Sequence, residues 1–233
     1  MLIKGIQKTT LIDYPNKIAA TIFTADCNFR CPFCHNKDLV KNPEKLPSIP
    51  EDEIVVFLKE RQNYLEGLVI TGGEPTLHHD LIDFIERIKK ETTLAVKLDT
   101  NGTNPILIKQ LIDRKLVDYI AMDIKTSLNK YCLAAGVNVD LEKIKESTEI
   151  LLKGDVDYEF RTTVVPDFFT EDDALSIAGW LKGAKLYSLQ QFFPSETCLD
   201  PDFSKKEPYS LHKLGEFRGL MKNSFEKIEI KNI

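Results

Sequence analysis

The sequence predicts an α/β fold: a partial, open, TIM-like (β/α)6 barrel of parallel strands that forms a single domain over residues 1–233. Apolar, β-rich runs alternate with helical stretches at intervals of roughly 25 residues. Repeated strand–helix–strand units of this kind form right-handed crossovers, which make the strands parallel. About six units are visible, fewer than the eight of a closed barrel. No repeat or linker divides the chain.

The predicted elements follow one another regularly along the chain. Apolar, β-branched runs predict the strands Ile18–Thr24, Gly67–Thr71, Leu94–Asp99, Tyr119–Ile124, Glu159–Val165 and Leu186–Phe192. Apolar positions three and four residues apart predict the helices Glu53–Arg61, Leu81–Lys90, Pro105–Arg114, Leu141–Leu152 and Asp172–Leu181. Helix-start signals lie at Ser48–Glu53, Asn104–Pro105 and Thr170–Asp173. This core spans about residues 16–193, and a helix near Tyr209–Lys222 and a strand at Glu226–Ile230 follow it, within about residues 209–230.

Composition limits the classes of function. The chain is 42% hydrophobic and 29% charged, as is usual for a globular protein that buries a full core. Its net charge of −5 provides no broad basic surface, so we expect no nucleic-acid partner. No apolar run is long enough to span a bilayer, and the N-terminus lacks the features of a signal peptide. We therefore expect a cytoplasmic protein without a membrane partner.

Polar side chains gather where the predicted strands end. The second strand runs into Thr71–Pro75, the third into Asp99–Gly102 and the fourth into Asp123–Lys125, while the fifth carries Arg161. The carboxyl ends of parallel strands share one edge of the sheet, where active sites of such folds lie. The sequence therefore predicts a site at this edge.

Three of the five cysteines lie within eight positions, at Cys27, Cys31 and Cys34. Clustered thiols in a reducing compartment indicate metal or redox chemistry rather than a disulfide framework. Thiolates are the usual ligands of iron–sulfur clusters, and a four-iron cluster normally takes four. Because a fourth nearby cysteine is missing, one iron is expected to stay open for an exogenous ligand. The alternatives are a structural zinc site that uses His35, or three free buried thiols.

The CxxxCxxC spacing, with Phe33 before the last cysteine, resembles that of the radical S-adenosylmethionine (SAM) superfamily. His35-Asn36 narrows the resemblance to the activating enzymes of glycyl-radical enzymes. The segment Thr10–Pro15 and the lack of extra cysteines resemble the branch that activates anaerobic ribonucleoside-triphosphate reductase. The superfamily resemblance extends from Gly5 to about Phe193.

The resemblance implies two cofactors, a [4Fe–4S] cluster and SAM, which binds the open iron. The implied cluster ligands are Cys27, Cys31 and Cys34. The implied SAM-binding residues are Phe33, Gly72, Gly73, Glu74, Asp99, Asp123, Lys125 and Arg161. Some relatives carry a histidine in the segment that matches Gln190–Phe193, and this chain has none there.

Each strand end has an implied role toward SAM. Gly72-Gly73 would let the cofactor lie against the backbone, and Glu74 would accept a hydrogen bond from its ammonium group. Asp99 and Asp123 would line the cofactor and can hold a monovalent cation, with Lys125 at the cofactor carboxylate.

Simpler interpretations stay open for several of these residues. Gly72–Pro75 alone is typical of a strand-end turn. Asp99 and Asp123 end neighbouring strands, so their carboxylates are expected to approach one another. They could simply form a hydrogen-bonded pair that caps the sheet edge, or Asp99 could cap a helix. Arg161 could serve in an internal ion pair, and Phe33 could stack on adenine or only pack. The histidines expected to be solvated, without a catalytic role, are His78, His79 and His212.

The resemblance also implies the reaction. A reduced cluster cleaves SAM to methionine and a 5′-deoxyadenosyl radical, which abstracts hydrogen from a glycine of a partner enzyme, here anaerobic ribonucleotide reductase. Flavodoxin or ferredoxin would donate the electron, and no side chain is needed as a general acid or base. Two other functions stay open: a small radical SAM enzyme acting on a metabolite or nucleobase, such as a deazapurine synthase, and a non-catalytic metal-binding module.

Overall fold

The computed structural model describes residues 1–231, which form two compact units. The first unit comprises Met1–Asn28, Asp38–Ala121 and Asp155–Asp157. The second comprises Phe29–Lys37, Met122–Gly154 and the described residues from Tyr158 onward. The cysteine segment is therefore divided after Asn28. The single domain over residues 1–233 stays a prediction, and its last two positions lie outside the described residues.

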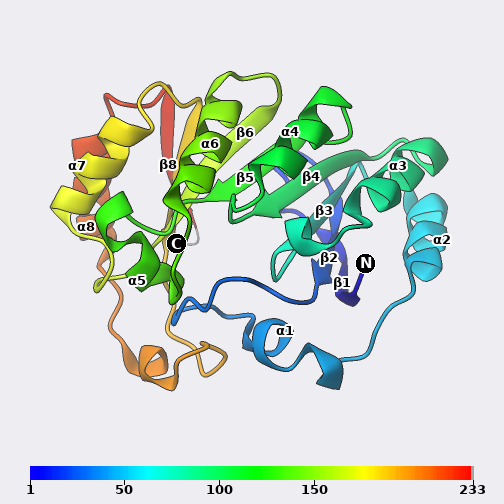
Figure 1. The fold of residues 1–233 in the computed structure, drawn as a ribbon, viewed down its shortest axis with the longest axis horizontal. Coiled ribbons are helices and arrows are strands. Elements are labelled where there is room, and N and C mark those ends of the chain that lie inside the picture. The colour runs from blue at the N-terminus through cyan, green and yellow to red at the C-terminus, as the bar shows by residue number, and fades with distance from the viewer. Residues whose placement is uncertain (232–233) are drawn as a thin grey trace. The chain divides into compact units, whose positions relative to one another are not determined.

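Strands of the first unit follow the order of the chain (Figure 1): β1 (Ile3–Thr10), β2 (Ala19–Thr24), β3 (Gly67–Gly72) and β4 (Ala95–Thr100). β2, β3 and β4 run parallel, with Ile22 opposite Ile70 and Ile70 opposite Leu98. All three side chains are fully buried. Apolar residues on both faces are typical of a parallel sheet covered by helices. β5 (Tyr119–Asp123) begins in this unit and ends in the second.

β1 was not among the predicted strands, and it runs antiparallel to β2. Its sequence, IKGIQKTT, mixes polar with apolar residues, and most of its side chains are at least partly exposed. An edge strand of this kind lacks the continuous apolar run that identifies a buried strand. The sheet therefore has, beside its parallel strands, one antiparallel edge strand that was not predicted.

The second unit contains β6 (Asp157–Val164), β7 (Leu186–Gln191) and β8 (Lys227–Lys231), which are parallel neighbours in that order. A buried carboxylate joins all three strands. Glu159 of β6 accepts hydrogen bonds from Ser188 Oγ of β7 and from Lys231 Nζ of β8, each at 2.6 Å. The predicted last strand, Glu226–Ile230, is confirmed as β8, with both ends one residue later.

The six predicted helices are confirmed to within two residues: α2 (Glu51–Arg61), α3 (Leu81–Glu91), α4 (Pro105–Asp113), α6 (Leu141–Leu152), α7 (Glu171–Trp180) and α8 (Leu211–Met221). Short elements were not predicted: α1 (Lys37–Lys41), α5 (Tyr131–Ala135), and the 3₁₀ turns η1 (Pro43–Lys45), η2 (Pro75–Leu77), η3 (Leu128–Lys130) and η4 (Pro201–Lys205). Such short elements carry too few periodic positions for recognition. Across residues 1–231, no helix has the length and apolar character needed to cross a membrane.

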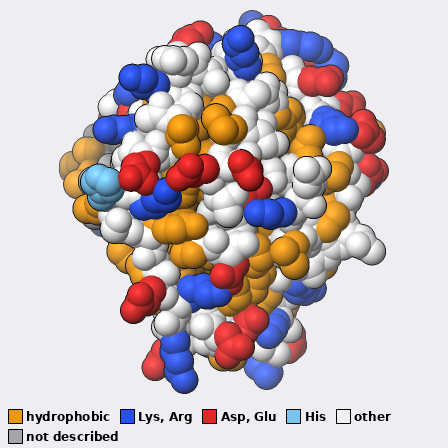
Figure 2. Space-filling view, turned by 90° about the vertical axis from the view of Figure 1, so that its left-hand side faces the viewer, with side chains coloured by type: hydrophobic (Ala, Val, Ile, Leu, Met, Phe, Trp, Pro, Cys, Tyr) orange, Lys and Arg blue, Asp and Glu red, His pale blue; other side chains and the backbone are white. Residues whose placement is uncertain are grey.

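Surface charges of both signs are mixed. Figure 2 shows lysine and arginine side chains interspersed with aspartate and glutamate on one face of the protein. Hydrophobic side chains lie between them. This face therefore carries charges of both signs.

The start of α7 fixes the loop that follows β5. Thr170 and Asp173 form a capping box, in which Asp173 accepts from Thr170 N at 2.9 Å. Asp173 also accepts from Ser127 Oγ at 2.6 Å and from Lys130 Nζ at 2.7 Å. One buried carboxylate thus serves the helix start and the loop together.

Thr170→Ala tests this cap. Loss of the Oγ1 acceptor is expected to lower the free energy of unfolding by about 1 kcal/mol, measured by urea denaturation. Thr93→Ala is the control, because Thr93 is exposed and lies outside the helices. We expect it to change stability by less than about 0.5 kcal/mol. Equal losses in the two variants would contradict a capping role for Thr170.

Candidate functional site

The cysteine segment leaves β2 through a tight turn at Asp26, whose φ of 62° is left-handed. The Asp26 backbone is held on both sides: its N–H donates to Leu39 O at 3.0 Å, and its carbonyl accepts from Glu74 N at 2.7 Å. Aspartate tolerates this backbone conformation better than most residues. Cys27 therefore starts a loop at the carboxyl end of a parallel strand, where a site was predicted.

The remainder of the segment is a second turn. Cys34 N donates to Cys31 O at 3.0 Å, and Arg30 N donates to Ala135 O at 2.8 Å. Cys31 is buried and Cys34 is partly buried. Burial raises the pKa of the Cys34 thiol, while the Asn36 backbone and the Lys125 charge act in the opposite direction.

A loop after β7 lies against this second turn. The sequence did not reveal this contact. Leu199 N donates to Cys34 O and Asp200 N donates to Pro32 O, both at 2.9 Å. His35 Nε2 lies 2.8 Å from Phe193 O. Because a metal-ligating histidine commonly donates its other ring N–H to a carbonyl, this contact leaves open the alternative of a zinc site that uses His35.

Side chains for metal binding are not gathered at one point. Within residues 1–231, no group of three or more His, Cys, Asp or Glu side chains is placed so that it could hold a metal ion. Cys27 belongs to the first unit, and Cys31 and Cys34 belong to the second. Their joint ligation of a cluster stays a prediction that rests on the donor type, since thiolates suit iron–sulfur clusters.

Gly72 and Gly73 lie where the end of β3 meets the segment that leads to the cysteines. A Cβ at Gly72, whose φ is 123°, would lie 2.3 Å from Thr24 N. At Gly73 it would lie 1.8 Å from Asp26 O. Close backbone packing therefore requires both glycines. Their contact with a cofactor stays a prediction.

Glu74 is 1% exposed and is surrounded by donors. Its Oε1 accepts from Thr76 N at 3.1 Å, Thr76 Oγ1 at 2.5 Å and Thr100 Oγ1 at 2.7 Å. Its Oε2 accepts from Asn101 N at 2.7 Å. Burial raises the pKa of this carboxyl, and the four hydrogen bonds oppose that effect. In this structure Glu74 joins the ends of β3 and β4, and its contact with the SAM ammonium stays a prediction.

Asn101 was not named among the site residues, although it lies beside the first cysteine. Its Nδ2 donates to Asn28 Oδ1 at 2.8 Å and makes a long contact of 4.0 Å with Cys27 Sγ. The signal in the sequence was its place in the strand-end segment Asp99–Gly102.

Asp99 forms an ion pair with Lys97 of the same strand. Lys97 is 1% exposed, and its ammonium also lies 6.0 Å from the centre of the Tyr119 ring. Lys97 was not among the predicted site residues, although a lysine within an apolar strand signals a buried partner. The expected approach of Asp99 to Asp123 stays a prediction.

Asp123 is held between two cations in the second unit. Its Oδ1 accepts from Arg161 Nε at 2.9 Å, and its Oδ2 accepts from Lys125 Nζ at 3.1 Å. Burial favours the neutral carboxyl, but the two positive charges prevail and lower the pKa of Asp123 to about 2. The same pairing raises the pKa of Lys125 against the effect of burial. Arg161 therefore forms the internal ion pair that was predicted as the alternative to a role in SAM binding.

Phe33 is buried and packs against Phe168, with ring centres 5.7 Å apart. Phe168 in turn stacks on Phe203 of η4 at 5.9 Å. These contacts give Phe33 a packing role, and its stacking on adenine stays a prediction.

His78 does not conform to its prediction. It is only partly exposed, and its Nε2 lies 3.0 Å from Ala25 O, two residues before Cys27. The expectation of a solvated side chain is therefore wrong for His78, whose place after η2 brings it back to β2. His79 and His212 are exposed, as expected.

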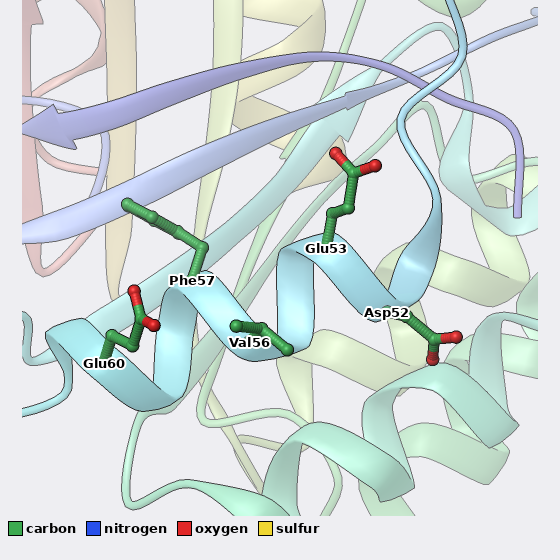
Figure 3. Close-up of a pocket in the computed structure, with 5 residues that line it drawn as sticks. All are labelled: Asp52, Glu53, Val56, Phe57 and Glu60. Carbon is green, nitrogen blue, oxygen red and sulfur yellow. The ribbon is translucent and has the colours of Figure 1, made fainter.

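A hollow of about 370 Å³ lies along α2 (Figure 3). Its lining comprises Asp52, Glu53, Val56, Phe57 and Glu60. Figure 3 shows these side chains projecting from one helix. Because none of them is a predicted site residue, we do not place the functional site there.

Comparison with known proteins identifies the family. The sequence profile of the Radical SAM superfamily matches residues 21–181. A Methanocaldococcus jannaschii protein named "putative glycyl-radical enzyme activating enzyme" is 36% identical over 236 aligned residues, which cover 100% of this chain and 96% of that protein.

Solved structures resemble the fold. Streptococcus suis SuiB has a TM-score of 0.67 at 13% identity, and the match covers 89% of this chain but only 47% of SuiB. A domain of the pyruvate-formate lyase-activating enzyme from Bacteroides vulgatus has a TM-score of 0.55 at 18% identity, with coverage of 71% and 99%. These likenesses confirm the predicted fold class, an α/β partial barrel whose strands are mostly parallel.

Gly73→Ala tests the close backbone approach at the cysteine segment. The added methyl group would displace Asp26, so we expect a loss of about 1–3 kcal/mol in the free energy of unfolding, measured by urea denaturation. Gly179→Ala in α7 is the control, because its Cβ would meet nothing within 4 Å. The control should gain up to about 1 kcal/mol. A neutral Gly73→Ala would contradict the packing argument.

Asp123→Asn tests the ion pairs of Asp123. The folded pKa of about 2 lies below the ordinary 3.8, so the carboxylate stabilises the fold above about pH 4. This contribution is lost as the pH falls from about 4 towards 2. The urea midpoint of the wild type should therefore fall more steeply in this range than that of the variant. Near pH 7 the variant should be less stable, because Arg161 and Lys125 keep uncompensated charges.

Asp113→Asn provides the control, since the Asp113–Lys109 pair is exposed. Its pH profile should follow that of the wild type. If Asp123→Asn also gave a parallel profile, Asp123 would not be ionised with a depressed pKa in the folded protein.

Proposed function

The chain belongs to the Radical SAM superfamily, and from this membership we propose that it is the activating enzyme of a glycyl-radical enzyme. The observation that carries the proposal is the 36% identity to a protein of that name, with 96% of that protein covered. The family implies a [4Fe–4S] cluster and SAM as cofactors.

The chemistry of the groups beside the cysteines supports such a cluster. The ammonium of Lys125 interacts electrostatically with Cys31 and Cys34, and an amide donor of Asn101 contacts Cys27. A nearby cation or donor stabilises a thiolate ligand and is unexpected around buried neutral thiols. When bound, the cluster would supply the electron that splits SAM into methionine and the 5′-deoxyadenosyl radical.

The second unit offers an anion-binding group. Asp123 orients Lys125 and Arg161, and an ammonium such as that of Lys125 has the charge and the donors that suit a carboxylate. We assign Lys125 to the SAM carboxylate and Arg161 to its support. Because all three side chains are mostly withdrawn from solvent, this attraction is screened less than at an open surface.

In the first unit, the backbone at the end of β3 packs closely against the segment that leads to the cysteines. Gly72-Gly73 bring the backbone of the cysteine segment close to β3, and the contacts of Glu74 hold this arrangement. We propose that SAM lies along this backbone, with its ammonium towards Glu74. We also propose Phe33 as its adenine contact, Asp99 as a residue that lines it, and the two aspartates Asp99 and Asp123 as ligands of a monovalent cation.

We propose a cytoplasmic protein whose partner is anaerobic ribonucleotide reductase, with flavodoxin or ferredoxin as electron donor. The segment Thr10–Pro15 and the absence of further clustered cysteines support this partner. The protein would abstract hydrogen from one glycine of the reductase and would need no acid–base residue of its own.

The experiment reconstitutes the protein anaerobically with iron and sulfide and reduces it with dithionite. We expect a four-iron electron paramagnetic resonance signal that changes when SAM is added. Cys31→Ser should lose that change, whereas Cys132→Ser should keep it, because Cys132 lies outside the cysteine segment in α5. Zinc without sulfide, or a cluster indifferent to SAM, would overturn the assignment of the cysteines.

A second measurement tests the partner. Incubation with SAM, a reductant and anaerobic ribonucleotide reductase should produce the doublet of a glycyl radical, and a Gly→Ala variant of the reductase should not. SAM cleavage without any glycyl radical would retain the cofactor chemistry and contradict the activating function.

A further inference from the structure

A closed ring of hydrogen bonds lies next to Cys27. Asn101 Nδ2 donates to Asn28 Oδ1 at 2.8 Å, and Asn28 Nδ2 donates to Thr103 Oγ1 at 2.9 Å. Thr103 Oγ1 donates to Asn101 Oδ1 at 2.7 Å and completes the ring. All members belong to the first unit, as does Cys27.

The ring fixes which way the Asn101 amide points. Asn101 Oδ1 accepts from Thr103 N at 3.0 Å as well as from Thr103 Oγ1. A backbone N–H can only donate, so the oxygen must face Thr103 and the NH₂ group must face Asn28 and Cys27. These hydrogen bonds therefore establish that the NH₂ group of Asn101, and not its oxygen, faces Cys27 Sγ.

The ring is also anchored to the sheet. Asn101 N donates to Glu74 Oε2 at 2.7 Å, and Glu74 is tied to Thr76 and Thr100. Asn101 is 5% exposed, so water competes little for its donors. A side chain held this firmly can keep one N–H directed at a neighbouring sulfur.

We propose that Asn101 is a positioning residue for the cluster: it orients Cys27 and donates to its sulfur, which raises the reduction potential. The inference rests on the proposed function, because it requires a cluster held by Cys27. Donation to a ligating sulfur withdraws electron density, which favours the more negative, reduced state of the cluster. Orientation of the first ligand should also slow loss of iron.

The test compares two Asn→Asp substitutions in the same loop. Asn101→Asp removes the amide donor and places a carboxylate near Cys27. Asn104→Asp is matched in chemistry, because Asn104 also loses one amide donor, to Thr76 O, and aspartate can keep its cap on α4. Reconstituted wild type and variants are poised at a series of potentials, and the reduced cluster is counted by electron paramagnetic resonance.

At a fixed potential, the ratio of reduced to oxidised cluster should fall about tenfold in Asn101→Asp, a shift of about 59 mV for one electron. Release of iron to a chelator should become several-fold faster. Asn104→Asp should match the wild type in both measurements. Wild-type potential and iron release in Asn101→Asp would overturn the inference while leaving the proposed function intact.

Thr103→Val tests whether the amide donor of Asn101 or the fold of its loop sets the reduction potential. This variant keeps the Asn101 donor but loses two bonds of the ring, so the potential should shift by much less than in Asn101→Asp. An equal shift would show that the fold of the loop, and not the amide donor, sets the potential.

Asn101→Ala, checked by circular dichroism, covers the case in which the buried charge of Asn101→Asp prevents folding. If wild type forms no iron–sulfur cluster, the inference and the proposed function both fail.

Discussion

The Glu74 carboxylate lies buried at the junction of β3 and β4 and accepts four hydrogen bonds from three residues. A buried carboxylate without partners would be strongly destabilising, so the donors around it must be held in place. The same segment contacts the turn at Asp26, because Glu74 N donates to Asp26 O. The position of Cys27, the conformation of Asn101 and the close approach at Gly73 all depend on this one group.

In the second unit, too, donors hold a carboxylate in place, but here the donors are positively charged side chains. Asp123 stands between Lys125 and Arg161, and one carboxylate near two cations leaves a net positive charge beside the Cys31–Cys34 turn. Such a charge favours anionic ligands, and at Cys34 it opposes the burial that raises the pKa of the thiol. The carboxylate also offsets the repulsion between the two cations, and so holds Lys125 just after β5 and Arg161 within β6.

The two units carry different groups. The first has closely packed backbone at Gly72-Gly73 and one cysteine of the segment, and the second has cationic side chains and two cysteines. A chemistry in which the cofactors carry out the difficult step requires from the protein mainly orientation and exclusion of water. The buried, fully hydrogen-bonded groups in both units are suited to that role, since their reorganisation would be costly.

The sequence by itself determined the fold class, the extents of the six long helices and of the buried strands, and the family. Periodic apolar residues and the three-cysteine spacing are local patterns, so they can be recognised without coordinates. Only the tertiary structure decided the partners of the polar residues. Asn101 beside Cys27 and His78 beside Ala25 became visible through the fold, because separate strand ends must converge before such contacts exist. The edge strand β1 was missed for a related reason: pairing with β2, rather than its own sequence, makes it a strand.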